Sequence, residues 1–371
     1  MPNMFGPWRV ETLQPGFRQF IERAGVLRTI NTDYAPSAEG NVVKIPYSKK
    51  RAGGDFTPGV VPANTANYVA ESRTFTIDKW KFVEVLTVSN LETTNVSPEI
   101  FAAELTTAAQ SLAEMVEKDI LANLWRGSKG CVNLSAAPSV ESWRGLTQPI
   151  RDAFKFMRQN SVPSAMRYMG LSPDGEAYVT GIEQAVAADS RGDAGVIVPG
   201  NIGMLSGAMV YSTSNMPENT GVSDGTLVNG AVAIGSTTFN FDSGTVRPGV
   251  MIQFGNGAER YLVKGVDGNT ATLDRATTAA IADNAPVRAP DGVQSHLYYR
   301  DSLAFAMRNP RGLVIGGSGA LQQELPITDP ESGFGFRVVM QSWNGQTRVY
   351  IDTGYGYGQL QEDAGVGLSP A

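Results

Sequence analysis

The sequence has 371 residues, of which 42% are hydrophobic and 18% charged, which is typical of a folded protein with two or three modules. Lys and Arg number 30 against 36 Asp and Glu, so the formal net charge is −6. This charge disfavours tight nonspecific nucleic-acid binding, which requires clustered cations. One cysteine excludes an intrachain disulfide, and one histidine excludes a multi-histidine metal site. No signal peptide and no membrane-spanning run is expected.

The first 40 residues predict an arm with one short helix. Phe17, Phe20 and Ile21 fall at helical spacing after a Pro-Gly pair, and Gly25 is a natural stop. A helix this short is unstable alone because nucleation is costly, so it must dock on another surface. We name Phe17 and Phe20 as candidate contacts with another copy of the chain.

Residues 41–88 predict a long β-excursion, an outgoing and a returning strand around an irregular tip. Its apolar positions alternate along the strands: Val43, Ile45 and Tyr47 going out, then Phe75, Ile77, Val83 and Val85 on one face of the return. A two-stranded ribbon is marginal by itself in water, and a tip of about 20 residues is unusual in a compact domain. Either the loop is functional or another chain supports it.

The tip carries the only dense basic cluster of the sequence, Lys49-Lys50-Arg51. The cluster is either a solvated loop or a charged tip that meets acidic residues on another copy, and we favour the second interpretation. A nucleic-acid contact is weakly supported, because three charges in an acidic chain make a small footprint. With Asp55 and Phe56, these residues complete the set of candidate inter-subunit contacts.

The strongest local prediction is a helix of nearly thirty residues after Ser97, a good N-cap, and Pro98, suited to the first helical position. Gly127 ends it. Its continuous apolar stripe contains Phe101, Leu105, Ala108, Leu112, Val116, Ile120 and Leu124. We interpret the acidic side chains Glu114, Glu117 and Asp119 as a solvated or inter-subunit face.

The rest of the chain predicts mixed α/β structure with a small β-module. One helix begins near Thr147 and another follows Ser172. Residues 222–290 contain short strands separated by turn signals, which predict an inserted barrel or sandwich: 238–241, 250–254, 260–264 and 270–273. The Asn344-Gly345 pair predicts a hairpin near the C-terminus.

No motif in the sequence indicates catalysis, a cofactor or a metal. We interpret His296 as a structural residue and Cys131 as a small buried hydrophobe, although the two could in principle form a nucleophile pair. The glycines near Gly316 lack the Lys-Ser or Lys-Thr of a phosphate loop. A pair of carboxylates for glycoside hydrolysis is not excluded, because such a site needs only two. We expect no catalytic, cofactor-binding or metal-binding residues and no enzymatic activity.

In their order, the elements resemble the Hong Kong 97 fold of tailed-bacteriophage major capsid proteins, in particular podovirus coat proteins with an extra β-domain. The segments that carry the resemblance are 74–80 (TFTIDKW), 108–121 (AAQSLAEMVEKDIL), 207–217 (GAMVYSTSNMP), 296–307 (HLYYRDSLAFAM), 337–341 (RVVMQ) and 349–358 (VYIDTGYGYG). Each segment is a weak signal alone, and their order over nearly the whole chain is the specific one.

The resemblance implies an α+β fold with five parts. They are an N-terminal arm (1–40), an extended β-loop (41–88), a peripheral domain with the spine helix (89–127 and 328–371), an axial domain (128–221 and 291–327) and a small inserted β-barrel (222–290). It further implies pentamers and hexamers of the chain in an icosahedral virion capsid, assembled in the host cytoplasm with a scaffolding protein and a portal protein. Packaged DNA would be enclosed without sequence-specific binding, and no membrane partner is implied.

A second hypothesis is a β-rich phage tail adhesin or carbohydrate-active protein. It rests on the 222–290 module and on the carboxylates that the sequence leaves free for acid–base chemistry. The predicted helix of nearly thirty residues argues against it.

Overall fold

The computed structural model divides the chain into two compact units, which are described separately. Unit 1 comprises 1–21, 31–112 and 304–360, and unit 2 comprises 22–30, 113–303 and 361–371. The structure describes residues 25–34, 38–39, 41–47, 71–89, 98–134, 148–180, 203–219, 222, 225–242, 244–255, 257, 259–289, 292–308, 321–328, 335–343 and 346–369. Across these ranges no helix combines the length and the hydropathy that a bilayer crossing requires.

The smaller sheet of unit 1 contains β1 (Ala38–Glu39), β2 (Val42–Tyr47) and β3 (Glu71–Thr76) in that order. Strands β2 and β3 pair antiparallel from Val42 opposite Thr76 to Tyr47 opposite Glu71, as expected for the base of the ribbon. Their apolar side chains are covered by the unit's own chain, in a cluster of Val43, Ile45, Phe75, Ile77, Ala304, Ala306 and Leu360. The base of the ribbon therefore does not need the expected support from another chain, because residues more than 200 positions away in the sequence return to pack on it.

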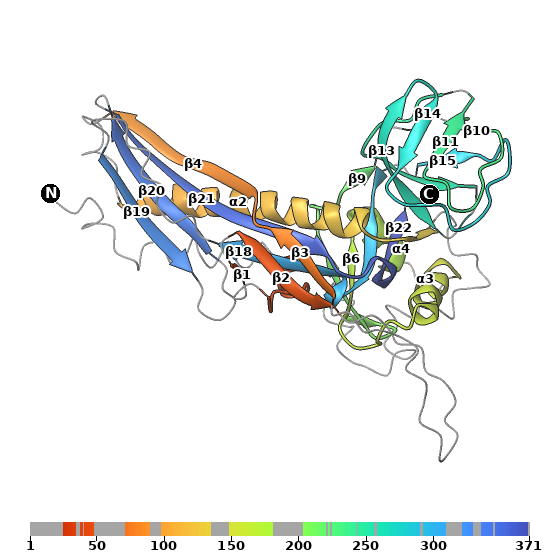
Figure 1. Ribbon diagram of the computed structural model, residues 1–371. Helices are drawn as coiled ribbons and strands as arrows, with labels where there is room; N and C mark the ends of the chain where they lie inside the picture. The colour runs from red at the N-terminus through yellow and green to blue at the C-terminus, as the bar shows by residue number, and fades with distance from the viewer. Residues whose placement is uncertain are drawn as a thin grey trace, which may run out of the picture. The chain divides into compact units, whose positions relative to one another are not determined.

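The second sheet of unit 1 has five strands, and the excursion 41–88 does not return as one strand. Strand β4 (Lys79–Ser89) separates from β3 at Ile77–Asp78 and pairs with β21 (Gln346–Gln359). On its other side β21 pairs with β20 (Gly335–Trp343), with Trp343 opposite Gln346 as the predicted two-residue hairpin requires. Strands β18 (Leu303–Arg308) and β19 (Leu321–Thr328) complete the sheet (Figure 1).

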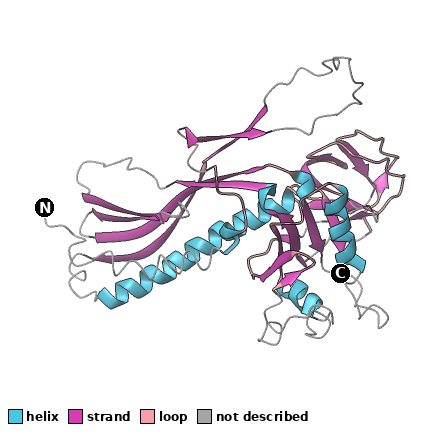
Figure 2. Ribbon diagram, turned by 90° about the horizontal axis from the view of Figure 1, so that it is seen from below, coloured by secondary structure: helices cyan, strands magenta, loops and turns pink. Residues whose placement is uncertain are grey.

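Helix α2 (Pro98–Arg126) has the predicted bounds and is one continuous helix (Figure 2). Every member of its predicted apolar stripe is at most 5% exposed. Its 29 residues span roughly 43 Å at 1.5 Å per residue. Both views show its first half running along the five-stranded sheet of unit 1 (Figures 1 and 2), while residues 113–126 belong to unit 2.

Unit 2 is built on a mixed six-stranded sheet in the order β5-β22-β17-β6-β8-β7. The strands are β5 (Gly130–Asn133), β6 (Arg167–Leu171), β7 (Met204–Leu205), β8 (Ala208–Ser212), β17 (Ser295–Tyr299) and β22 (Gly365–Ser369). Helices α3 (Gln148–Gln159) and α4 (Pro173–Thr180) begin where the sequence predicts helices. Strand β22 lies between β5 and β17.

Residues 228–288 of unit 2 form a second six-stranded sheet in the order β10-β11-β14-β13-β12-β15, green to cyan in Figure 1. Its strands are β10 (Val228–Asn229), β11 (Thr238–Phe241), β12 (Met251–Phe254), β13 (Arg260–Asp267), β14 (Thr270–Leu273) and β15 (Val287–Arg288), so the four predicted strands are present. Strand β9 (Glu218–Asn219) pairs with β16 (Gly292–Val293).

The two edge strands of this sheet are linked by backbone hydrogen bonds. Val228 N donates to Ala285 O, and Val287 N donates to Thr226 O, both at 2.9 Å. These bonds support closure into a small barrel, which stays a prediction.

Candidate functional site

The single histidine and the single cysteine are buried in unit 2, and neither is suited to catalysis there. His296 is 1% exposed and Cys131 is 4% exposed. Burial lowers the pKa of His296 well below its usual value, and the nearby Arg260 charge lowers it further. Burial also raises the pKa of Cys131. A buried protonated thiol is a poor nucleophile, which agrees with the interpretation of both residues as structural.

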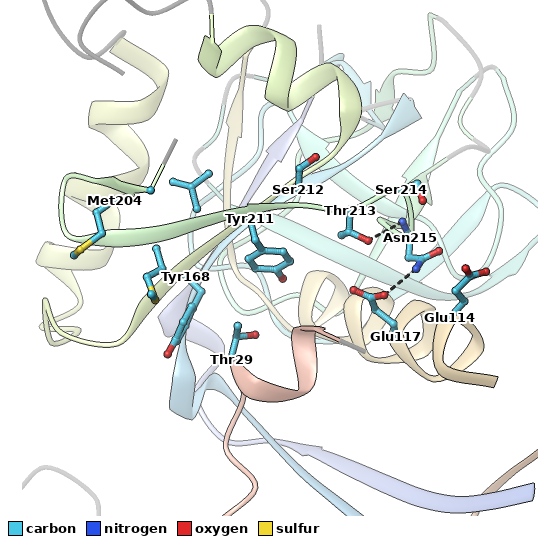
Figure 3. A pocket seen from close by; sticks show the side chains of 13 residues that line it. Thr29, Glu114, Glu117, Tyr168, Met204, Tyr211, Ser212, Thr213, Ser214 and Asn215 are labelled. Atoms are coloured by element: carbon cyan, nitrogen blue, oxygen red, sulfur yellow. Dashed lines mark hydrogen bonds between the residues drawn. The ribbon is translucent and has the colours of Figure 1, made fainter. Parts of the chain in front are cut away.

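A cavity of about 640 Å³ lies in unit 2 (Figure 3). It is lined by residues of the turn after the 3₁₀ helix η1, of α2, β6, β7 and β8, and of the segments before β7 and after β8: Thr29, Glu114, Glu117, Tyr168, Gly203, Met204, Met209, Val210, Tyr211, Ser212, Thr213, Ser214 and Asn215. The 3₁₀ helix η1 spans Gly25–Arg28. Within the described ranges, no three His, Cys, Asp or Glu side chains gather closely enough to hold a metal ion.

Glu117 lies on the polar side of this cavity. It is 3% exposed, and its Oε2 accepts a hydrogen bond of 2.8 Å from Asn215 Nδ2. The expectation of a solvated or inter-subunit face is therefore wrong for Glu117. Its partner Asn215 is 98 residues away in the sequence, so the local acidic pattern could not indicate this contact.

Hydroxyl groups form a hydrogen-bonded chain beside the cavity. Tyr211 and Tyr298 hydroxyls lie 2.8 Å apart, and the Tyr298 hydroxyl also contacts Thr29 Oγ1. Burial, with Tyr298 nearby, raises the pKa of Tyr211 well above its usual value. Burial also raises the pKa of Tyr298, so both phenols are neutral and the cavity offers carboxylates and neutral hydroxyls that can hydrogen-bond a polar or cationic group.

One face of the five-stranded sheet of unit 1 carries two exposed aromatic side chains, Trp80 and Phe82. We name it the open face and define it by Trp80, Phe82, Glu84 and Tyr350. Trp80 is 52% exposed and Phe82 60% exposed. Trp80 lies over Gly354, where a Cβ would come within 2.2 Å of the indole. The Phe82 ring meets Tyr350 edge-on at 6.4 Å.

Ion pairs accompany the aromatic residues of the open face. Arg348 Nη2 lies 2.9 Å from Glu84 Oε2, and the Arg348 guanidinium lies 5.8 Å from the Tyr350 ring centroid. On β20, which pairs with β21, Arg337 forms ion pairs with Asp352 at 2.5 Å and with Glu324 at 3.1 Å. Charged pairs next to exposed aromatic rings are typical of a surface that another protein covers.

The structure does not place the side chains that the sequence predicts as inter-subunit contacts. All seven lie outside the described residues: Phe17, Phe20, Lys49, Lys50, Arg51, Asp55 and Phe56. They stay predictions.

Sequence reasoning missed Trp80 and Phe82. Their alternation with Lys79 and Lys81 is a signal of a strand with one exposed face. The interpretation of 41–88 as a single ribbon obscured it, because the partner of β4 is a strand more than 250 residues later.

Comparison with known proteins finds similarity in structure only. No family model and no curated protein matches the sequence. A chain of Mycobacterium phage Che8 matches with a TM-score of 0.51 at 15% identity, over 92% of this chain and 89% of that chain. The asymmetric unit of the bacteriophage PhiM1 mature capsid matches with a TM-score of 0.50 at 11% identity, over 90% of this chain and 82% of that chain.

The chain has the fold of a phage capsid protein. The resemblance predicted from the order of elements is thereby confirmed at the level of the fold, which is α+β with mostly strands. The capsid fold spans about nine-tenths of the chain. At identities of 15% and 11%, the likeness shows the fold alone.

Proposed function

We propose that this chain is the structural major capsid protein of a tailed bacteriophage, which self-assembles into the pentamers and hexamers of an icosahedral shell. The observation that carries the proposal is the capsid fold over 90% of the chain in the match with the PhiM1 capsid. The shell would enclose double-stranded DNA without sequence-specific binding, in keeping with a net charge of −6. The chain would act in the virion after assembly in the host cytoplasm, and it would not be an enzyme.

A scaffolding protein and a portal protein are the further partners of this proposal. The five-part division stays part of it, with 222–290 as an inserted β-barrel and 1–40 as an arm. The seven side chains predicted from the arm and the tip are the proposed contacts with neighbouring copies. Weak contacts of this kind suffice in a closed shell, because every subunit repeats them.

The open face of unit 1 belongs to the same proposal, with a second copy of the chain as its occupant. Two of its aromatic side chains are more than half exposed, so they leave apolar area in water. Burial of that area against a second copy would stabilise the contact by about 25 cal/mol per Å². Glu84 and Arg348 at its edge can exchange partners with charges on another copy.

Sedimentation velocity of the purified full-length chain tests the proposal. We expect particles of megadalton size above a threshold concentration, with or without a scaffolding protein. A monomer at every concentration, salt and temperature would count against a shell subunit.

The tail adhesin or carbohydrate-active protein is not favoured, because the capsid fold extends far beyond the β-module that prompted it. That alternative predicts binding or cleavage of glycans. A glycan array probed with the full-length chain would show it, and a silent array would end it.

A further inference from the structure

Arg260 connects the inserted sheet of unit 2 to the C-terminal end of α2. It is the first residue of β13, and its side chain is fully buried. Its Nη2 donates to Trp125 O, its Nε donates to Ser128 O at 3.2 Å, and its guanidinium lies 4.6 Å from the Trp125 ring centroid. The side chain thus reaches from the inserted sheet to the last turn of the helix.

The helix end explains why a cation is stable there without a salt bridge. The last carbonyls of a helix lack intrahelical partners and carry the negative end of the macrodipole. Within the described part of the chain, Arg260 forms no ion pair with a carboxylate, so carbonyls and an aromatic face compensate its charge. Burial lowers the pKa of Arg260 to about 10, which leaves it charged at neutral pH.

We name the contact between Arg260 and the end of α2 the joint. Backbone contacts of β13 support it. Arg260 N donates to Lys129 O at 3.1 Å, and Glu259 forms an antiparallel bridge with Gly130. Strand β22 runs past the guanidinium at Gly367, where an added Cβ would come within 1.9 Å of Arg260 Nη1. The helix end, β13 and β22 therefore enclose Arg260 without spare room.

His296 lies in the same enclosure, opposite Gly367 in the β17–β22 ladder. Its Nε2 is 2.6 Å from Ser128 Oγ, and Ser128 Oγ donates to Leu124 O at 2.8 Å. A hydroxyl has one proton to donate, so Ser128 accepts from the Nε2–H of a neutral imidazole. The remaining nitrogen, Nδ1, is buried without a hydrogen-bond partner.

We propose that Arg260 and His296 form an acid-sensitive lock that holds the inserted sheet on the helix end and on the β5-β22-β17-β6-β8-β7 sheet of unit 2. With His296 neutral, the Arg260 charge is held by the helix-end carbonyls and the joint is closed. A proton on His296 would place a second positive charge beside Arg260. The repulsion between these two buried positive charges is relieved when the joint opens and both side chains reach water.

Among the described residues, the groups around the imidazole offer little to offset that second charge. Arg260 faces it from β13, Cys131 lies on β5, and Tyr298 follows it on its own strand with ring centroids 5.4 Å apart. From β22 the neighbours are Gly365 and Gly367, which carry no side chain.

The direction of the pH effect follows from the pKa of His296, which burial and Arg260 lower in the folded chain. The open joint binds the proton with an ordinary histidine pKa near 6.5, and the closed joint does not. The closed state is therefore at full stability above about pH 6.5 and loses stability as the pH falls below it.

Cys131 is a native reporter of the opening, because it is the single cysteine of the chain and is buried against the inserted sheet, with its Sγ 3.9 Å from Gln253 Oε1 on β12. The experiment measures its labelling by 4,4′-dithiodipyridine in the full-length chain, relative to the urea-unfolded chain at the same pH. If only the open joint takes up the proton, labelling should rise about 30-fold between about pH 7.5 and pH 5.0. His296→Gln keeps a neutral donor for Ser128 and should reduce that rise to about threefold or less.

A second pair of variants tests Arg260 itself at neutral pH. Arg260→Gln should label at least about tenfold faster than the parent chain, because the helix end loses its cation. Arg247→Gln, at an exposed arginine of the same inserted segment, should label like the parent.

Two results would overturn the lock: an equal acid-induced rise in the parent chain and His296→Gln, or parent-like labelling of Arg260→Gln. If the glutamine variants fail to fold, an NMR titration of the parent decides, because its single histidine gives one imidazole signal. A signal that titrates near pH 6.5 while Cys131 stays protected would refute the proposal.

Discussion

Gly367 shows how single atoms fix the packing of unit 2. A Cβ there would overlap Arg260 Nη1 at 1.9 Å, in a fully buried enclosure. We predict that Gly367→Ala lowers the apparent Tm by roughly 5 °C, because overpacking a core costs on the order of 1–3 kcal/mol. Thermal denaturation followed by circular dichroism measures it.

Gly265→Ala is the matched control for this prediction. It lies in β13, the strand that carries Arg260, and a Cβ there meets nothing within 4 Å. Its Tm should stay within about 2 °C of the parent, and equal losses in the two variants would contradict the role given to the close contact.

Phe82 is the residue that tests the open face. Its ring is 60% exposed, so Phe82→Ser should leave the apparent Tm of the subunit within about 2 °C of the parent. If a second copy covers the ring, the concentration required for assembly should rise about tenfold or more. Light scattering against concentration measures that threshold.

Ile234→Ser provides the comparison, because Ile234 is 67% exposed but lies in the inserted segment. It should assemble at the parent's threshold. A parent-like threshold for Phe82→Ser would remove the open face from the proposed contacts.

At the scale of elements, the sequence predicts those that depend on local signals. Helix α2 was predictable to its last residue because Pro98 begins it, the apolar stripe runs along it and Gly127 directly follows its last residue. The strands at 238–241 and 270–273 were predictable because turn residues bound short alternating runs.

Local signals do not predict the pairing of elements whose partners lie far away in the sequence. Strand β4 pairs with β21, and β22 pairs with β5 and β17, through registers that no local pattern encodes. The buried position of Glu117 depends on Asn215 in the same way. The proposed contacts of the arm and the tip lie outside the described residues, so they still rest on the sequence.

The inserted sheet is the element with the most self-contained core. All of its buried apolar residues lie between Val228 and Val287. We therefore predict that the fragment 222–290 folds alone, with a β-type circular dichroism spectrum and a cooperative thermal transition. In this fragment the Arg260 side chain would lie in water, where an isolated charge is stable.

A longer fragment, 218–293, is the control for lost support because it retains the β9–β16 pair. Disorder of both fragments would show that the inserted sheet requires the helix end and the β5-β22-β17-β6-β8-β7 sheet in order to fold.

At the scale of the whole molecule, the basic tip should contribute to assembly and not to the stability of the subunit. We predict that replacing Lys49, Lys50 and Arg51 with Ala raises the assembly threshold and leaves the apparent Tm within about 2 °C of the parent. The parent's threshold should also rise with salt more steeply than the variant's, because salt screens charge pairs between copies. Light scattering across a salt series measures both thresholds.

The double variant Lys264→Ala, Arg247→Ala removes two exposed cations from the inserted segment and serves as the charge control. It should assemble like the parent. A loss of Tm in the triple tip variant as large as its loss of assembly would place the tip within its own subunit.

The most direct test of the shell proposal is cryo-electron microscopy of the full-length chain after expression. We predict closed particles whose maps show rings of five and six copies, each with the fold described above, and with Trp80 and Phe82 covered by a neighbouring copy. Single subunits or small soluble oligomers in every condition, with or without a scaffolding protein, would contradict the account.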